Sequence, residues 1–378
     1  MQILISPNAF KNSLSAADAA DAIKEGLLES KLDCTCNCFP VGDGGDGTAE
    51  LIIQHCNGVS IAAEVHDPLG RKIFSSFGLI DDGKTAVIEM ANASGLRLLK
   101  PTELNPLHAS SFGTGELIKH ALNNGVNKII LCIGGSASID GASGILEALG
   151  IRFLNKSGNT LNNLPENMID LDSIDLSGID ERIMKCKLVV LCDVENVLLG
   201  KDGAANVFGP QKGAGLAEVI KLEVALTRLR DVVLQQMNKD MSLIKHGGAA
   251  GGVAAGLSTL LNAELVNGIE YFLMLTGFDK ALKKTKIVIT GEGSIDIQTL
   301  RGKGPFGVAK MAKQKNIPVI GLAGQIPSVI PAELEKYFDV LLYINNELVD
   351  ISRAMANTRN NLKRTGMLIG NLLALKEQ

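Results

Sequence analysis

The sequence lacks the features that several large classes of protein require. It has no block of basic residues, because its 37 basic and 41 acidic side chains are well mixed and leave a net charge of −4. Nucleic-acid binding needs clustered positive charge, so we expect no nucleic-acid partner. No apolar stretch is long enough to cross a bilayer, and residues 1–12 do not resemble a signal peptide. We therefore expect a cytoplasmic protein with no membrane partner.

The cysteines form no disulfide or metal motif. Seven are present, an odd number, and Cys34, Cys36 and Cys38 alternate in the stretch LDCTCNCF. In a strand all three lie on one face, where neighbouring sulfurs are poorly placed to form a bridge. The stretch has no C-x-x-C pair and no nearby histidine. Small buried hydrophobic residues are therefore a better interpretation than metal ligands.

Three common catalytic or nucleotide-binding motifs are also missing. A P-loop needs G-x-x-x-x-G-K-[ST], but the lysine of RGKGPFG is followed by Gly304 and lacks the upstream glycine. No G-x-G-x-x-G follows a predicted strand, and no G-x-S-x-G elbow occurs. These absences argue against a standard P-loop protein, a hydrolase and a nicotinamide-dependent oxidoreductase acting on a hydroxy acid.

Alternation of strand and helix patterns is the main sign of the fold. The chain has 378 residues, enough for two domains. A β-α-β-α rhythm runs over 2–56, returns over 112–149, and resumes from 286, ending in a helix over 349–375. Such a rhythm predicts parallel strands joined by crossover helices. Between these segments, a long helix is predicted at 216–237 and a buried strand at 188–194.

The rhythm breaks near residue 61, where consecutive strands joined by polar turns predict antiparallel or mixed pairing. We therefore expect an α/β fold with two domains and a cleft between them. A flavodoxin- or Rossmann-like parallel domain is expected to comprise 1–60, 99–149 and 284–378. An inserted mixed α+β domain is expected to comprise 61–98 and 150–283.

Glycine is abundant, with 41 residues, and is clustered. VGDGGDG, CIGGSASIDG and TGEGSID each end a predicted strand. In parallel α/β sheets, ligands bind just outside such strand ends. A helix that follows contributes unpaired amides and a positive dipole end, which suit phosphate. These turns therefore predict a phosphate-binding edge.

Acids accompany the glycine turns and could hold a metal. They are Asp43, Asp140, Asp193, Glu292 and Asp296. Carboxylates and phosphate oxygens are the ligands that Mg²⁺ prefers, and a phosphoryl-transfer site also needs positive charge. Lys11, Lys212 and Lys303 could supply it. Each acid could instead cap a turn, Lys212 could be a solvated surface residue, and the glycine-rich segment 247–257 could be either a tightly packed helix or a phosphate-facing turn.

Seven stretches in order resemble the bacterial glycerate kinase family, of the glycerate 2-kinase type. They are PNAFKNSLSA (7–16), PVGDGGDGT (40–48), SFGTGELI (111–118), IGGSASIDGASG (133–144), DVENVLLGKDGAANVFGPQKGA (193–214), GGAAGGVAAGL (247–257) and TGEGSIDIQTLRGKGPFGVAK (290–310). The resemblance implies transfer of the γ-phosphoryl group of ATP to D-glycerate, with Mg²⁺ as cofactor and 2-phosphoglycerate and ADP as products. A homodimer is an assembly that the sequence leaves open.

The resemblance and the strand-end positions together suggest roles for individual residues. For catalysis we expect Lys11, Asp43 and Asp193, where either acid could orient the hydroxyl or accept its proton. For the substrate we expect Ser111, Thr114 and Lys212. For Mg²⁺ we expect one or two of Asp43, Asp140 and Asp296. For the nucleotide we expect Gly134, Gly135, Ser136, Gly291, Glu292, Gly293, Gly302 and Lys303.

The chain departs from the family pattern at two positions that could contact substrate. Asn8 stands where the pattern has an acid, and Ser294 stands where it has arginine. These departures leave two alternatives to the kinase of D-glycerate. One is a family member that binds a sugar acid or a nucleotide without efficient turnover, and the other is a kinase for a related small hydroxy acid.

Overall fold

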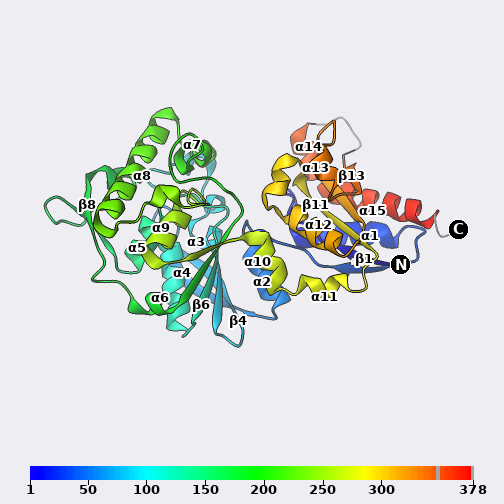
Figure 1. Ribbon diagram of the computed structural model, residues 1–378, viewed down its shortest axis with the longest axis horizontal. Helices are drawn as coiled ribbons and strands as arrows, with labels where there is room; N and C mark the ends of the chain where they lie inside the picture. The colour runs from blue at the N-terminus through cyan, green and yellow to red at the C-terminus, as the bar shows by residue number, and fades with distance from the viewer. Residues whose placement is uncertain (346–349, 376–378) are drawn as a thin grey trace. The chain divides into compact units, whose positions relative to one another are not determined.

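The chain folds into two compact units in the computed structural model, which describes residues 1–345 and 350–375. The terminal unit comprises Met1–Asp43 and Gly268–Gln378, and the central unit comprises Gly44–Asn267. Figure 1 colours the chain from blue to red, so the terminal unit contains both the darkest blue and the orange to red segments. The chain therefore passes from one unit to the other at 43–44 and returns at 267–268.

The terminal unit is built on a five-stranded sheet in which all neighbouring strands are parallel. Its order is β2 (Thr35–Cys38), β1 (Gln2–Ile5), β11 (Ile287–Ser294), β12 (Val319–Gln325) and β13 (Val340–Tyr343). Counted within this unit the order is 2-1-3-4-5, which is the flavodoxin-like arrangement. The direction of sheet growth reverses between β1 and β11, and ligands of such sheets bind beside that point.

Helices cover this sheet because its three central strands, β1, β11 and β12, are buried on both faces over most of their length, as parallel strands usually are. The helices are α1 (Ala16–Leu28), α10 (Gly268–Leu275), α11 (Phe278–Leu282), α12 (Gly304–Gln314), α13 (Ala332–Glu335), α14 (Ile351–Ala356) and α15 (Thr358–Ala374). Helices α1 and α15 lie side by side (Figure 1), so closely that a Cβ on Gly26 would come within 1.9 Å of the Lys363 carbonyl oxygen. Residue 349, the expected start of the last helix, lies outside the described residues.

The central unit is built on a six-stranded mixed sheet. Its order is β10 (Glu264–Asn267), β9 (Lys187–Cys192), β6 (Lys128–Cys132), β5 (Thr85–Glu89), β4 (Lys72–Ile80) and β3 (Val59–His66). The strands from β10 to β5 are parallel, whereas β3, β4 and β5 pair antiparallel. The expected break in the β-α rhythm near residue 61 is thus confirmed.

Helices and one small hairpin complete the central unit. The helices are α2 (Thr48–His55), α3 (Ala91–Ser94), α4 (Phe112–Asn123), α5 (Ser143–Ala148), α6 (Glu181–Lys185), α7 (Ala204–Phe208), α8 (Leu216–Met237) and α9 (Val253–Leu261). The hairpin pairs β7 (Arg152–Asn155) with β8 (Leu171–Asp175). Helix α8 has the expected boundaries, because its apolar residues recur at helical spacing along one face.

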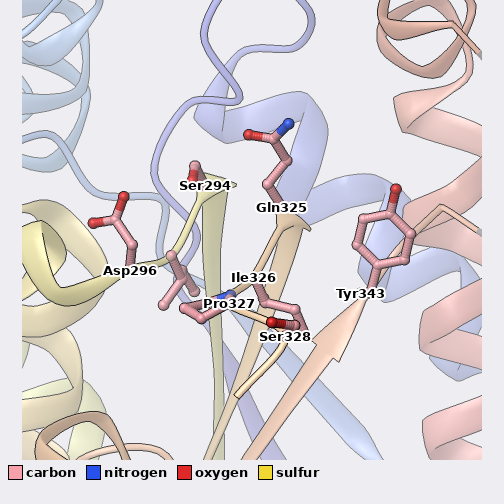
Figure 2. A pocket seen from close by; sticks show the side chains of 8 residues that line it. Ser294, Asp296, Gln325, Ile326, Pro327, Ser328 and Tyr343 are labelled. Carbon is pink, nitrogen blue, oxygen red and sulfur yellow. The ribbon is translucent and has the colours of Figure 1, made fainter. Parts of the chain in front are cut away.

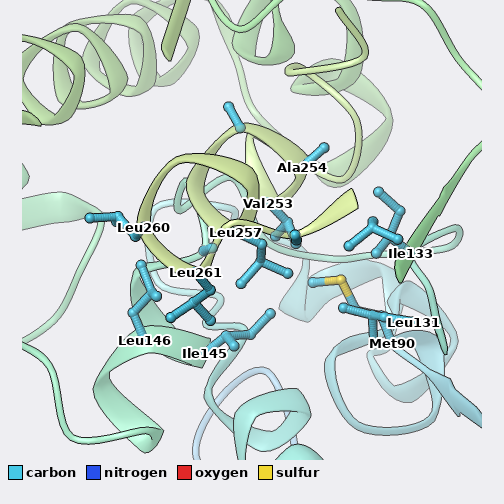
Figure 3. Packing of buried hydrophobic residues seen from close by; sticks show 14 of the residues in the cluster. Met90, Leu131, Ile133, Ile145, Leu146, Val253, Ala254, Leu257, Leu260 and Leu261 are labelled. Carbon is cyan, nitrogen blue, oxygen red and sulfur yellow. The ribbon is translucent and has the colours of Figure 1, made fainter. Parts of the chain in front are cut away.

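Helix α9 lies in the core of the central unit. Figure 3 shows Leu257 and Leu261 of this helix beside Ile145 and Leu146. A Cβ on Gly256 would come within 2.1 Å of the Gly141 carbonyl oxygen. The glycine-rich segment 247–257 therefore brings two backbones into contact, which favours tight packing over a phosphate-facing turn.

The two units have different boundaries from the expected domains. Residues 44–60 and 99–149 belong to the central unit, because β6 pairs with β5 and β9 and not with the sheet of the chain ends. Residues 268–283 belong to the terminal unit. The alternation of strands and helices predicted these elements correctly, but it does not specify which sheet a strand joins.

All seven cysteines are free thiols. Cys36 lies on β2 and Cys34 directly precedes this strand, and their Sγ atoms are 3.8 Å apart. Burial is the main reason that the pKa of the Cys36 thiol rises to about 12. A thiol with so high a pKa is a poor nucleophile and a poor metal ligand at neutral pH.

Candidate active site

The carboxyl edge of the terminal sheet brings Asp43 against the start of a helix. Asn8 follows β1, Asp43 follows β2, and Gly304 is the first residue of α12. The Asn8 side-chain amide donates to Asp43 Oδ2 at 2.8 Å, and the Gly304 N–H donates to the same oxygen at 3.3 Å. The Ala9 N–H donates to Asn8 Oδ1 at 2.8 Å, which orients the Asn8 amide nitrogen toward Asp43. Asp43 is therefore held in a fixed orientation and is only 4% exposed.

Glu292, near the end of β11, lies in the same neighbourhood. It is buried, and its Oε1 accepts a hydrogen bond from the Thr299 hydroxyl at 3.1 Å. Burial raises the pKa of Glu292 to about 7; the positive charge of Lys303 opposes this rise, the negative charge of Asp43 adds to it, and Lys11 opposes it. The structure thus brings together four predicted residues from three separate stretches of sequence.

The remaining predicted residues of this edge are mainly structural. Gly291 lies inside β11, where a Cβ would come within 2.2 Å of the Leu322 carbonyl oxygen. Gly302 has φ +102° and ends the 3-10 helix η6 (Ile297–Arg301). Asp296 caps the start of η6, where its Oδ1 accepts from the Gln298 N–H at 2.8 Å. Gly293 lies next to Lys11, whose backbone nitrogen would be 3.9 Å from a Cβ on that glycine.

Asp140 forms the centre of a second cluster, in the central unit. It is fully buried, and one oxygen accepts from the Ser111 N–H at 2.8 Å, the Ser111 hydroxyl at 2.7 Å and the Gly144 N–H at 3.3 Å. The other oxygen accepts from the Ala142 N–H at 3.2 Å and the Ser138 hydroxyl at 3.3 Å. Because both oxygens already accept hydrogen bonds, Asp140 is better suited to hold two loops together than to bind a metal.

Lys212 is buried against this cluster and is not a surface residue. Its ammonium group donates to the Ser136 hydroxyl at 2.8 Å and to the Ser138 carbonyl oxygen at 2.7 Å. Burial lowers the pKa of Lys212 to about 7, and the negative charge of Asp140 opposes this shift. A lysine in this position can carry or release a proton near neutral pH.

Other predicted residues of the central unit contact backbone or side-chain atoms of the same unit. The Thr114 hydroxyl donates to the Ser94 hydroxyl at 2.8 Å, and the Gly134 N–H donates to the Gly44 carbonyl oxygen at 2.9 Å. Gly135 has φ +70°, and a Cβ there would come within 2.0 Å of the Asp46 carboxylate. Asp193 directly follows β9 and is partly exposed. It therefore belongs to a different unit from Asp43, the other acid expected in catalysis.

Glu89 is a buried acid that no sequence motif indicated. It lies at the end of β5, and its two oxygens accept from the Gly47 N–H, each at 3.0 Å. Its Oε2 also accepts from the Ala49 N–H at 3.2 Å, and burial raises its pKa. Glu89 thus caps α2 from a strand 40 residues away. Asp46, which directly precedes the N-cap residue Gly47, is exposed.

The three acids predicted for metal binding are divided between the two units. Asp43 and Asp296 belong to the terminal unit and Asp140 to the central unit. Within 1–345 and 350–375, no group of three histidine, cysteine, aspartate or glutamate side chains has a geometry that could hold a metal ion. Mg²⁺ often takes only one or two protein carboxylates together with phosphate and water, so Asp43 still fits such a role.

The fold and the first cluster define a class of protein: an α/β protein with carboxylates, lysines and a helix N-terminus at the carboxyl edge of a parallel sheet. Within this class, the chain belongs to the glycerate kinase family, whose family model matches residues 3–374.

Relatives of known name cover almost the whole chain. It is 39% identical to the glycerate 2-kinase of Escherichia coli over 375 residues, which are 99% of this chain and 98% of that protein. It is 41% identical to a glycerate kinase of Halalkalibacterium halodurans over 93% of both chains. A crystal structure of putative glycerate kinase 2 from Salmonella typhimurium LT2 is similar, with a TM-score of 0.83, 40% identity, and coverage of 100% of this chain and 99% of that one. In the described part of the chain, no helix is long and apolar enough to span a membrane.

Proposed function

We propose that this protein transfers the γ-phosphoryl group of ATP to D-glycerate and forms 2-phosphoglycerate and ADP. The observation that carries the proposal is the grouping of Asp43, Glu292, Lys11 and Lys303 at the switch point of a parallel sheet, in a chain of the glycerate kinase family. Relatives that share about 40% of its residues over nearly their whole length are named glycerate 2-kinase or glycerate kinase. A homodimer stays a prediction.

Glu292 is the residue that we assign to proton transfer. A general base works best when its pKa lies near the working pH, and burial brings that of Glu292 to about 7. The glycerate hydroxyl loses a proton when it attacks phosphorus, and Glu292 would accept that proton. Asp43, which is buried at the same edge of the sheet, stays the alternative base.

The lysines of the cluster would balance the negative charge of the reactants. Phosphoryl transfer passes through a loose transition state, so catalysis consists mainly of positioning and charge stabilisation. Lys303, at the N-cap of α12, would face phosphate, because the positive end of the helix dipole adds to its charge. Lys11 would hold the glycerate carboxylate. Mg²⁺, with Asp43 as a ligand, would neutralise the phosphate oxygens when bound.

Substitution of the two carboxylates tests these roles. In a coupled assay of ADP release with D-glycerate, Asp43→Asn and Glu292→Gln should each lower kcat about ten- to a thousandfold, the range for loss of one transition-state contact. Glu333→Gln, which changes an exposed carboxylate of the same unit, is the control and should keep full activity. Phosphorus NMR of the product should show 2-phosphoglycerate and no 3-phosphoglycerate.

Two results would contradict the assignment of these residues, and a third would contradict the kinase function itself. Near-normal turnover in both variants would exclude Asp43 and Glu292 from the chemistry. Loss of turnover in Asp193→Asn alone would instead place the base in the central unit. Absence of turnover in the wild type, together with binding of glycerate in calorimetry, would identify a binding protein and not a kinase.

A further inference from the structure

A pocket in the terminal unit is not explained by the roles assigned above. It has a volume of about 640 Å³ and lies where three neighbouring parallel strands end. Ser294, Gln325 and Tyr343 are the last residues of β11, β12 and β13, and Figure 2 shows them at the ends of these strands. The segments that follow β11 and β12 contribute the remaining lining, which includes Asp296 and Pro327. This volume falls within the range of pockets that bind small molecules.

The chemistry of the lining favours a neutral ligand. Its eight residues include one carboxylate, Asp296, and no lysine, arginine or histidine. A carboxylate or phosphate placed there would meet a negative charge with no cation beside it, which is unfavourable. Glycerate, whose charge needs a cation, therefore does not suit this pocket.

The same lining suits a nucleoside. Tyr343 is one of only three tyrosines in the chain and is 51% exposed at the rim, so its ring face is available to a flat base. Gln325 offers an amide that can both donate to and accept from a base. Asp296 accepts hydrogen bonds from the backbone N–H groups of Gln298 and Thr299, and the two oxygens of an ionised carboxylate have capacity to accept more, such as those of ribose hydroxyls.

The position of the pocket relative to the charged cluster also fits a nucleotide. Ser294 is separated from Glu292 by one residue, and Asp296 begins the η6 turn that leads to Lys303 and the start of α12. A ligand in the pocket therefore lies along the same chain segment as the groups proposed to hold phosphate. A site without cations that is joined through this segment to a lysine-bearing one matches the nucleoside and the phosphates of a nucleoside triphosphate.

We propose that this pocket, at Ser294, Asp296, Gln325 and Tyr343, binds the ribose and base of ATP, with Tyr343 stacking on the base. The proposal rests on the proposed kinase function for its choice of nucleotide. It adds the site that determines which nucleoside triphosphate is used, which the charged cluster alone cannot do, since phosphate is common to all of them.

Calorimetry with two probes tests the pocket directly. The full chain is titrated with ADP and, separately, with inorganic tripolyphosphate, which has no nucleoside. Tyr343→Ala should weaken ADP binding about tenfold or more, because stacking of a base on an aromatic ring contributes on this scale. Tripolyphosphate binding should be unchanged. Tyr343→Phe keeps the ring and should bind ADP like the wild type, and Val329→Ala, an exposed change outside the lining, is the control.

Each outcome separates this proposal from the kinase function. Equal binding of ADP by Tyr343→Ala and the wild type would overturn the pocket assignment, even if D-glycerate is phosphorylated normally. If Tyr343→Ala raises KM for D-glycerate and leaves KM for ATP unchanged, the pocket holds the acceptor acid. This result would also overturn the pocket assignment. ADP binding that depends on Tyr343 in a protein without glycerate turnover would support the pocket and contradict the kinase function.

Discussion

The roles of individual acids depend on the partners that the fold gives them. Asp140, fully buried, accepts hydrogen bonds on both oxygens from two loops and therefore fixes their positions. Glu292 is also buried and accepts a hydrogen bond from Thr299, and burial raises its pKa to about 7 although Lys303 and Lys11 oppose the rise. The sequence presented both as acids beside glycine turns and could not distinguish them.

Asn8 provides a test of the charge balance at the switch point. Asn8→Asp would place a second carboxylate at the position from which Asn8 now donates to Asp43 at 2.8 Å. Two carboxylates this close resist joint ionisation, so the pair and the neighbouring Glu292 should bind protons more tightly. We expect the acid limb of kcat/KM against pH to move upward by about one unit.

The control for this prediction is Asn8→Ala. It removes the same hydrogen bond without adding charge, so it should lower kcat/KM but leave the position of the acid limb unchanged. An identical pH profile for Asn8→Asp and the wild type would show that ionisation at this edge does not limit the reaction.

At the scale of helices and strands, local patterns predicted most elements well. The strands and helices from β1 to α2, the antiparallel run from β3 to β5, and α8 lie where the hydrophobic periods placed them. The start of α2 shows the limit of local patterns. Its cap is Glu89, which comes from β5, because tertiary folding brings that carboxylate to the free N–H groups of Gly47 and Ala49.

Helix α9 allows a test of close packing between elements. Gly256→Ala would place a Cβ 2.1 Å from the Gly141 carbonyl oxygen and 2.9 Å from the Ala142 side chain, so the helix or the turn must move. We expect the free energy of unfolding in urea to fall by about 1–3 kcal/mol, the usual cost of overpacking a core. Ser258→Ala on the same helix, which adds no atoms, should change it by about 0.5 kcal/mol or less. Equal stability of Gly256→Ala and the wild type would indicate that this contact relaxes freely.

At the scale of the whole molecule, each unit buries its own ionisable groups, and burial links stability to pH. Lys212 has a pKa of about 7 in the folded protein, against 10.5 for an ordinary lysine. Between these values the unfolded chain binds more protons than the folded one at this position. Its contribution to the free energy of unfolding therefore rises with pH from about 7 upward and is constant below.

Lys212→Met isolates this contribution. The thermal midpoint of the wild type, measured relative to that of Lys212→Met, should rise between about pH 7 and pH 9.5. Over this range the buried Lys212 is neutral in the folded wild type, so its charge no longer destabilises the fold, whereas methionine has no charge at any pH. Lys221→Met, which changes an exposed lysine on α8, is the control and should show no such trend relative to the wild type. A constant difference between the wild type and Lys212→Met would mean that Lys212 stays charged, or stays neutral, across this window.

The sequence by itself determined the α/β class, the order of strands and helices, and the glycine turns that carry acids. These follow from hydrophobic period and turn chemistry, which act over a few residues. The tertiary structure decided which sheet each strand joins, so that β6 pairs with β5 and β9, and which acids have partners. It also decided that Lys212 is buried and that Asn8 faces Asp43. Such contacts join residues up to hundreds of positions apart, and only the folded chain brings their atoms within hydrogen-bonding distance.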